Sequence, residues 1–472
     1  MKKQMTLVLV GGLFSLGVMA QERPNIILIM TDDQGWGQTG YYDHPLLKTP
    51  NLDRMAQKGL RLDRFYAGAP VCSPTRASVL TGRSCVRAGV PEHGYALRRQ
   101  ESVLPRALQA AGYATGHFGK WHLNGMRGPG VPIFKEDSHS PGAFGFDTWL
   151  TVSNFFDRDP IMSRNGTFEE FRGSSSDIIV DEALEFIENA LTEDSPFFAV
   201  LWDGSPHAPF VASEKDVEGF GHLDVRSRDH YGELVAFDRS LGRLRKRLRE
   251  LGISENTLLW FCSDNGGLPG MQPGSVGGLR GFKGSLWEGG IRVPCIIEWP
   301  GSVSPGTSDY PASTMDIFPT LAAILELPPK TMGKPLDGIS LKSLLEGRGR
   351  EGKARRRPIP FIYRDEGALV DNEFKLVATS IEKQQFQLFH LVRDPTESRD
   401  VSEIWPKKEK SLKRQFARWY ASIQRSIAGQ DYPEKVVDPN EPSPHFWKEA
   451  PKYKDFLQQH GDRPEYSGGY RK

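Results

Sequence analysis

The residues most suited to chemistry in this sequence are a cysteine and an arginine separated by three residues. Cys72 and Arg76 flank a Ser-Pro-Thr tripeptide, and a largely apolar run follows them. Because proline is tolerated in the first turn of a helix, Pro74 predicts a helix that begins beside Cys72. Free backbone N–H groups and the positive end of the helix dipole would then face position 72. Such a position favours a tetrahedral anion, although a buried structural cysteine is the alternative.

A second set of polar residues offers oxygen ligands to a metal ion. The apolar runs at residues 25–30 and 257–261 predict buried strands, and each run leads into a pair of Asp or Asn residues. In open α/β sheets ligands gather beyond the carboxyl ends of strands, and adjacent buried carboxylates are costly without a cation. Oxygen ligands suit Ca²⁺ or Mg²⁺ and suit zinc poorly, while a solvated turn is the alternative. The candidate ligands are Asp32, Asp33, Asp264 and Asn265.

Cationic side chains and histidines stand at similar places along the chain. Lys120 and His122 follow a strand-like run at residues 113–118. His207 lies between two prolines, which fix where its ring points, and Lys283 lies in a glycine-rich loop before another strand. Singly, such residues are more often surface groups. Together they could surround an anionic substrate with positive charge.

These motifs resemble those of type I sulfatases, the arylsulfatase-like branch of the alkaline phosphatase superfamily. The resemblance rests on C-x-P-x-R at Cys72, Gly-Lys-Trp-His at residues 119–122, and a G-x-K…E-G-G-x-R-x-P block at residues 281–294. The family usually has His-Leu-Gly after the second motif, where this chain has His-Leu-Asn-Gly. The resemblance implies an alkaline-phosphatase-like α/β domain with a mixed, mostly parallel sheet between helices. It also implies a small C-terminal α+β domain with an antiparallel sheet.

The resemblance further implies a modified nucleophile and a bound metal. A formylglycine-generating enzyme would convert Cys72 to formylglycine, whose hydrated aldehyde would attack sulfur. One oxygen of the modified Cys72 would complete the shell of a Ca²⁺ ion, with Mg²⁺ as the alternative. Arg76 would orient the modified residue, and Lys120 would stabilise its hydrate.

The remaining roles concern proton transfer. By resemblance, Asp264 would be the base for the attacking hydroxyl, and Lys283 and His207 would bind the ester bridge and protonate the leaving alcohol. His122 would take a proton from the second hydroxyl, so that sulfate leaves a covalent sulfo-enzyme. General acid–base steps of this kind give about 10² to 10⁴-fold each. The reaction would be that of a sulfuric ester hydrolase.

The substrate is less well defined by the sequence. An exported sulfatase of this kind most often resembles enzymes that act on sulfated carbohydrates, so we expect a sulfated glycan. Residues 125–173 are rich in Gly, Pro, Ser and Asp, and a loop of this length in a compact domain is usually functional or disordered. We expect much of this segment, together with the turn that carries His207, to form the rim of the pocket.

Two alternative functions stay open. A phosphatase or phosphodiesterase of the same superfamily would use Ser or Thr as its nucleophile, with transition metals held by His and Asp. Cys72 and the oxygen-only ligand set argue against that alternative. A catalytically silent glycan-binding relative would result if Cys72 stayed unmodified.

The rest of the chain predicts its location and domain organisation. Lys2 and Lys3 precede an apolar run that ends near Ala20, which is typical of a cleavable signal peptide and of a periplasmic or secreted protein. That run is too short to span a membrane, and a net charge of +1 over 472 residues gives no general attraction to nucleic acid. We therefore expect neither nucleic-acid binding nor membrane insertion. The predicted segments are a signal peptide at 1–20, a catalytic domain at 21–346, an α+β subdomain at 358–430 and an extended polar tail at 431–472.

Overall fold

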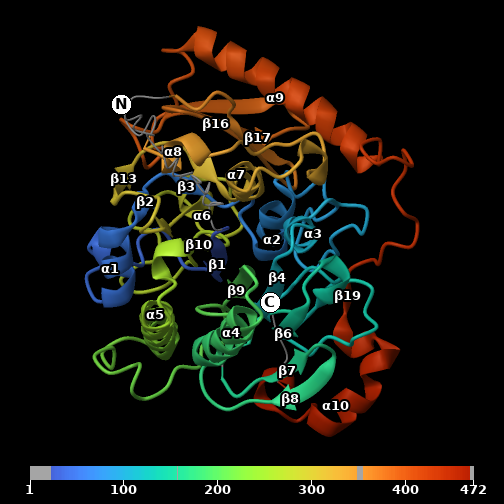
Figure 1. Cartoon of the computed structure of the whole chain (residues 1–472). Coiled ribbons are helices and arrows are strands. Elements are labelled where there is room, and N and C mark those ends of the chain that lie inside the picture. The colour runs from blue at the N-terminus through green and yellow to red at the C-terminus, as the bar shows by residue number, and fades with distance from the viewer. Residues whose placement is uncertain (1–22, 157, 348–353, 468–472) are drawn as a thin grey trace, which may run out of the picture.

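The computed structural model describes residues 23–156, 158–347 and 354–467 (Figure 1). The predicted signal peptide and most of the linker expected between the two predicted domains lie outside the described residues. Within the described ranges, no helix combines the length and the apolar character needed to cross a membrane.

A mixed ten-stranded sheet forms the centre of the molecule. Five parallel strands make up its middle, in the order β10 (Thr257–Ser263), β1 (Asn25–Thr31), β9 (Phe197–Trp202), β4 (Ala114–Lys120) and β6 (Thr148–Val152). One edge continues with β12 (Cys295–Glu298), β2 (Leu60–Leu62) and β13 (Gly306–Ser308). The other edge continues with the antiparallel strands β7 (Ile161–Arg164) and β8 (Thr167–Glu170).

Helices cover both faces of this sheet, so its central strands are buried on both sides (Figure 1). Along β1 the side chains alternate, with Leu28 in one core and Ile27 and Ile29 in the other. One face packs against α1 (Pro50–Lys58), α4 (Ser175–Thr192) and α5 (Val225–Glu250). The opposite face packs against α2 (Cys72–Thr81), α3 (Leu104–Ala110), α7 (Ile317–Ile324) and α8 (Lys342–Leu345). The predicted α/β class with a mixed sheet between helices is confirmed.

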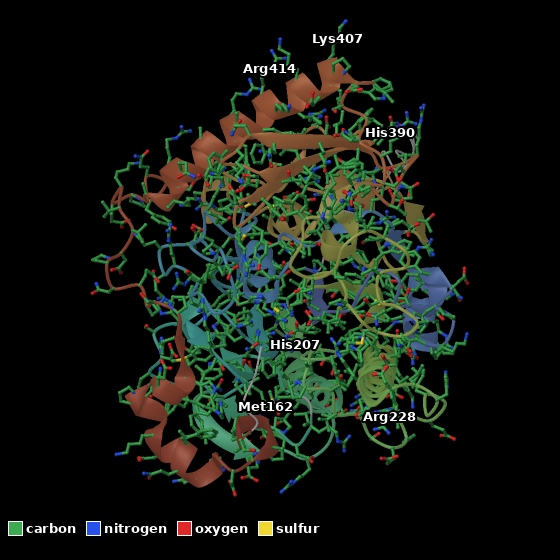
Figure 2. All side chains as sticks on the ribbon, turned by 180° about the vertical axis from the view of Figure 1, so that it is seen from behind. Met162, His207, Arg228, His390, Lys407 and Arg414 are labelled. Carbon is green, nitrogen blue, oxygen red and sulfur yellow. The ribbon has the colours of Figure 1, made fainter. Side chains whose placement is uncertain are left out.

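A second, four-stranded antiparallel sheet lies in the C-terminal part of the chain. Its strands are β15 (Ile359–Tyr363), β16 (Glu366–Asp371), β17 (Phe374–Ser380) and β18 (Gln385–His390). One face packs on the body of the large domain through a shared apolar cluster, and the other packs on α9 (Pro406–Ile427). Figure 2 shows Lys407 and Arg414 projecting outward from α9. The small α+β unit is therefore confirmed as well.

The irregular segment predicted at residues 125–173 is more ordered than its composition indicates. It contains β6, β7 and β8, which extend the large sheet, and the short β5 (Met126–Arg127). These strands have two to five residues, too few for a clear alternation of apolar and polar side chains.

The extended tail predicted from residue 431 also differs from the structure. Residues 445–467 form β19 (His445–Phe446), which pairs with β5, and the helices α10 (Lys454–His460) and α11 (Pro464–Ser467). Trp447, Tyr453 and Tyr466 are buried in one apolar cluster with residues of the large domain. A few widely spaced aromatic residues thus anchor a segment that is otherwise polar in composition.

Candidate active site

The carboxyl ends of β1, β9 and β10 meet at one edge of the sheet, where backbone hydrogen bonds tie their loops together. The N–H of Asp32 donates to the carbonyl of Ser205 at 3.0 Å, and the N–H of Asp264 donates to the carbonyl of Thr31 at 3.0 Å. Because these strands run parallel, the polar residues that follow them lie side by side. This juxtaposition is the one that the sequence predicts.

Two of the acidic residues are buried and paired with cations. Lys120 Nζ contacts Asp32, and Arg76 Nη2 lies 3.4 Å from Asp32 Oδ2. Lys283 Nζ lies 2.6 Å from Asp33 Oδ1. Burial alone would raise the pKa of each carboxyl, but the surrounding positive charges outweigh burial and hold the pKa of both below its usual range. Both side chains are therefore carboxylates at neutral pH.

Asp264 behaves differently from its two neighbours. Its Oδ2 accepts from Arg76 Nη2 at 2.8 Å, and its Oδ1 accepts from the N–H of Asp33 at 3.2 Å. Burial and the negative charge of Asp32 raise the pKa of Asp264 to about 7, although Arg76 opposes this shift. The site thus holds a carboxyl that can gain or lose a proton near neutral pH, as a general base must.

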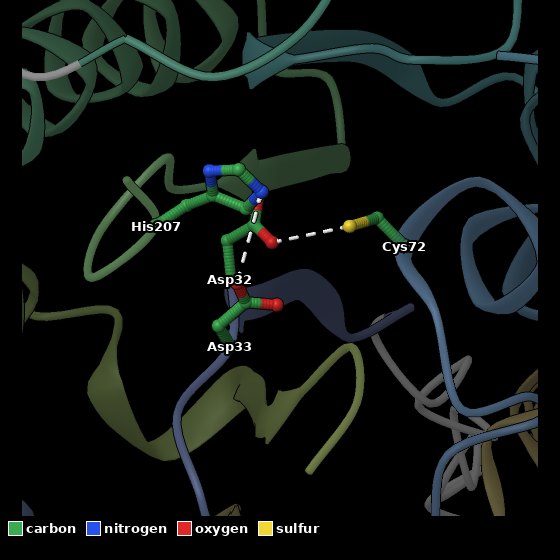
Figure 3. Close-up of side chains that lie close together, drawn as sticks. All are labelled: Asp32, Asp33, Cys72 and His207. Atoms are coloured by element: carbon green, nitrogen blue, oxygen red, sulfur yellow. Dashed lines mark hydrogen bonds and ion pairs between the residues drawn. The ribbon is translucent and has the colours of Figure 1, made fainter. Parts of the chain in front are cut away.

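Cys72 is the first residue of α2, a helix whose residues are all buried. Its Sγ lies 3.4 Å from Asp32 Oδ1 (Figure 3). Burial, reinforced by the negative charge of Asp32, raises the pKa of the thiol well above its ordinary value. Because the thiolate is the nucleophilic form of cysteine, the unmodified side chain is a poor nucleophile here.

The oxygen donors of the cluster fit a hard cation, although a sulfur and a ring nitrogen lie among them. Asp32, Asp33, Cys72 and His207 each offer one ligand atom, and these atoms all lie within 4.8 Å of one another (Figure 3). Asn265 Nδ2 donates to Asp33 Oδ1 at 2.8 Å, while its own Oδ1 is buried without a hydrogen-bond partner among the described residues. An unpaired amide oxygen beside carboxylates is the ligand type that Ca²⁺ and Mg²⁺ prefer. The ring nitrogen of His207 is an additional candidate that the sequence did not assign to a metal.

His207 lies at the rim of the cluster. Its Nε2 is 3.7 Å from Asp33 Oδ2, its Nδ1 donates to the carbonyl of Ala208 at 2.6 Å, and its ring stacks on Phe155 with centroids 4.7 Å apart. Burial and the nearby charge of Lys283 lower the pKa of His207 to about 4. The imidazole is therefore neutral in the free pocket and presents Nε2 to the cluster.

His122 and a histidine that the sequence analysis missed lie near each other. His122 is buried, and its Nδ1 has no hydrogen-bond partner in the part of the chain that the structure describes. The ring of His93 stacks with that of His122 at 6.3 Å between centroids. Burial and the charges of Lys283 and Lys120 lower the pKa of His93 to about 3, so it faces the same cationic cluster. His93 stands in a loop without periodic pattern, and only its place between Pro91 and Gly94 could have drawn attention to it.

The glycine-rich block around Lys283 has a structural role. A Cβ on Gly266 would lie 1.9 Å from the carbonyl oxygen of Gly289, so only glycine allows this close approach of the two loops. The carboxylate of Glu288 is buried and lies 3.0 Å from Lys375 Nζ of the small sheet. The loop that carries Lys283 is thus held by close packing against the loop at Gly266 and by the ion pair between Glu288 and Lys375.

Comparisons with known proteins show what this chain is similar to. Residues 24–327 match the family model described as Sulfatase. The chain is similar to N-acetylgalactosamine-6-sulfatase of Sus scrofa, with 36% identity over 394 residues that span 76% of this chain and 72% of the relative. Arylsulfatase A of Homo sapiens is 32% identical over 380 residues, spanning 71% of this chain and 70% of the relative. The solved structure of Ps i-CgsB in complex with k-i-k-neocarrahexaose shares the fold, with a TM-score of 0.75 at 24% sequence identity. The superposition covers 94% of this chain and 99% of that chain.

Proposed function

The chain belongs to the sulfatase family and is a sulfuric ester hydrolase, and we propose that it is exported and removes O-sulfate groups from a sulfated glycan or its oligosaccharides. The observation that carries this proposal is the buried cluster in which Cys72, at the start of a helix, lies against carboxylates and cations. The N-acetylgalactosamine-6-sulfatases among its relatives support a sulfated sugar as substrate. The basic and apolar character of residues 1–20 supports export.

The proposed nucleophile is formylglycine at position 72, made from Cys72 by a formylglycine-generating enzyme during maturation. The aldehyde hydrate supplies a hydroxyl oxygen for attack on sulfur. Two features of this chain support the modification. The thiol itself is held protonated by its surroundings, and the N-terminus of α2 favours negative charge at position 72.

The proposed metal is Ca²⁺ rather than Mg²⁺, and it supplies positive charge that polarises the hydrate and holds sulfate oxygens. The residues proposed to hold it are Asp32, Asp33, Asp264 and Asn265, with an oxygen of the modified Cys72. The orphaned Oδ1 of Asn265 supports this set. The three carboxylates already face Arg76, Lys120 and Lys283, so a dication would leave net positive charge for an anionic substrate.

The other proposed roles follow from the contacts of each side chain. Arg76 donates to the carbonyl of Lys120 at 3.0 Å and to Asp264, so its guanidinium is fixed and can orient the modified residue. Lys120 beside Asp32 would stabilise the hydrate. The pKa of Asp264 near neutrality suits a base for the attacking hydroxyl. The buried neutral ring of His122 would take the proton from the second hydroxyl.

His207 and Lys283 are proposed to act together on the leaving alcohol. Burial lowers the pKa of Lys283, but the negative charges of Asp33 and the other acidic groups around it raise that pKa by more than burial lowers it. Lys283 therefore carries a proton at neutral pH. His207 is neutral in the free pocket, and a bound sulfate monoester would bring negative charge that favours protonation of its ring. The pair can therefore deliver a proton to the bridging oxygen.

We expect His207→Ala to reduce kcat/KM on a sulfated sugar by about 10²-fold or more, and on 4-nitrophenyl sulfate by less than about 10-fold. A sugar alcohol is a poor leaving group that needs its bridging oxygen protonated, whereas a nitrophenolate leaves without help. The measurement is a comparison of kcat/KM for both esters. The control is His222→Ala, which removes an exposed histidine from the segment that follows His207. Equal losses of the His207 variant on both esters would remove His207 from the acid role.

The proposed function itself is tested by the product that the purified protein releases. Incubation with sulfated di- and tetrasaccharides should release inorganic sulfate, measured by ion chromatography. The same protein should release far less phosphate from matched phosphomonoesters. Phosphate release that exceeds sulfate release would instead identify a phosphatase of the same superfamily.

A further inference from the structure

A cavity of about 480 Å³ lies next to the proposed active site. Phe155, the residue that stacks on His207, forms part of its wall, so one aromatic ring separates this cavity from the catalytic histidine. Pro209 and Val211, which follow His207 in the chain, line it as well. Figure 2 shows His207 and Met162 in this part of the molecule, and Ile161 beside Met162 also contributes to the wall.

The cavity combines apolar rings with cationic side chains. Phe155 and Phe156 are only 7% and 6% exposed and provide apolar surface. Arg158 and Arg172 line the same cavity. Arg172 is 79% exposed and has one distant ion pair, to Glu170 at 3.9 Å, and no ion pair of Arg158 is found among the described residues. Both guanidinium groups are therefore available to a ligand.

The acidic residues of the cavity are already engaged. Asp159 Oδ1 accepts from the N–H of Gly173 at 2.7 Å, which turns that carboxylate toward its own loop. Glu465 Oε1 lies 2.5 Å from Arg463 Nε, so these two charges neutralise each other. With Arg463 and Glu465 paired, Arg158 and Arg172 still outnumber Asp159 among the charged lining residues, so the lining that the structure describes is net positive. Planar guanidinium groups bind sulfate and carboxylate in a bidentate manner, and aromatic rings pack against sugar rings.

The C-terminal segment forms one wall of this cavity, through Arg463, Pro464 and Tyr466. Arg463 donates to the carbonyl of Asp159, and Trp447 Nε1 donates to the carbonyl of Pro129 at 2.9 Å. These contacts hold the loop that carries Phe155 and Arg158. The folded C-terminal segment therefore does more than cover apolar surface, because it forms one wall of the cavity beside the proposed active site.

We propose that this cavity is a subsite for a second anionic sugar, one that carries a sulfate or carboxylate group and neighbours the sugar whose sulfate is removed. The inference rests on the proposed function, because it takes the ligand to be another unit of the same glycan chain. Because Phe155 both stacks on His207 and lines the cavity, two neighbouring sugar units could lie on either side of its ring. The subsite makes the protein prefer oligosaccharides to monosaccharides.

The test uses a double variant, Arg158→Gln with Arg172→Gln, in the full chain. Arg414→Gln is the matched control, because Arg414 is exposed on α9, far from the cavity (Figure 2). The probes are tetrasaccharides from heparin, chondroitin 6-sulfate and carrageenan, with N-acetylgalactosamine 6-sulfate as the monosaccharide. Calorimetry measures binding, and turnover of 4-nitrophenyl sulfate measures activity independently.

We expect the wild-type protein to bind at least one tetrasaccharide, and the double variant to bind it about 10-fold or more weakly, since the variant lacks two charged hydrogen-bond donors to the anionic group. Turnover of 4-nitrophenyl sulfate and binding of the monosaccharide should be unchanged in both variants. Equal tetrasaccharide affinity in wild type and double variant would overturn the subsite. The subsite would also be overturned if the protein hydrolysed 4-nitrophenyl sulfate but bound none of the tetrasaccharides. That result would leave the proposed sulfatase activity intact. Loss of 4-nitrophenyl sulfate turnover in the wild type would instead count against the proposed function.

Discussion

Replacing Cys72 by alanine should abolish hydrolysis of sulfate esters, with kcat falling on the order of 10⁴-fold or more, while the protein stays folded. The side chain at position 72 is the proposed source of the nucleophile, and among the described residues no other cysteine, serine or threonine side chain hydrogen-bonds to the Asp32 carboxylate. Its thiol makes one weak hydrogen bond, 3.4 Å from Asp32 Oδ1, and alanine removes only the sulfur atom from this buried position. Released sulfate and the thermal unfolding midpoint are the two measurements.

Cys85→Ala is the matched control for this variant. Cys85 is also a buried free cysteine, but it follows α2 and belongs to no group of candidate ligands in the described residues. The control should keep wild-type turnover. Peptide mass spectrometry of the native protein should find formylglycine at position 72 and unmodified cysteine at position 85. Residual activity of the Cys72→Ala variant above about 1% of wild type would contradict a nucleophile at this position.

The candidate site could be predicted from the sequence because its residues follow strands that are buried on both faces. Such strands are continuous apolar runs, and the polar residues that follow each run mark the edge where ligands gather. Asp32 and Asp264 stand at such positions, and the backbone bond from Asp264 to Thr31 joins their loops. Lys283, predicted to serve the same site, lies beside Asp33, with 2.6 Å between Nζ and Oδ1. Their catalytic roles remain predictions.

Other features could not be predicted because their signal lies in tertiary contacts. The pairing of β19 with β5 joins residues more than three hundred positions apart, and each strand has two residues, too few for any pattern. The buried group of Glu288, Lys375 and Glu397 reads in the sequence as ordinary surface charge. His93 belongs to the site through its packing against His122 alone. The cavity beside Phe155 depends on these same long-range contacts.

Asp264 links the metal, the base and the pH dependence of the protein. Its pKa of about 7 in the cluster lies above the ordinary value of 3.8, because burial and Asp32 disfavour its charged form. A carboxyl whose pKa is raised on folding contributes stability that is present at low pH and is lost as pH rises through the folded pKa. Without a cation, the free energy of unfolding should therefore fall as the pH rises from about 4 to about 7. A bound cation would remove that loss, because it favours the carboxylate.

Asp264→Asn should reduce kcat/KM on both a sulfated sugar and 4-nitrophenyl sulfate by about 10³-fold or more, because it removes a metal ligand and the base together. Activity with either ester depends on attack at sulfur, so the leaving group should make no difference. Asp238→Asn is the control, since Asp238 is also buried, with its pKa raised by burial, but it binds the backbone of α1 instead. A loss confined to the sugar substrate would contradict this assignment of Asp264.

The same pair of variants tests the cation directly. In the wild type, Ca²⁺ should raise the unfolding temperature more at pH 8 than at pH 5.5, because at the higher pH Asp264 is a carboxylate that burial and Asp32 destabilise by more than Arg76 stabilises it. Asp264→Asn should show a smaller Ca²⁺ effect with little pH dependence, and Asp238→Asn should behave as the wild type does. Elemental analysis of the active wild type should find calcium. Stoichiometric zinc without calcium or magnesium would contradict the oxygen-ligand site, because thiolate and imidazole, not carboxylate and amide oxygens, are the ligands that zinc prefers.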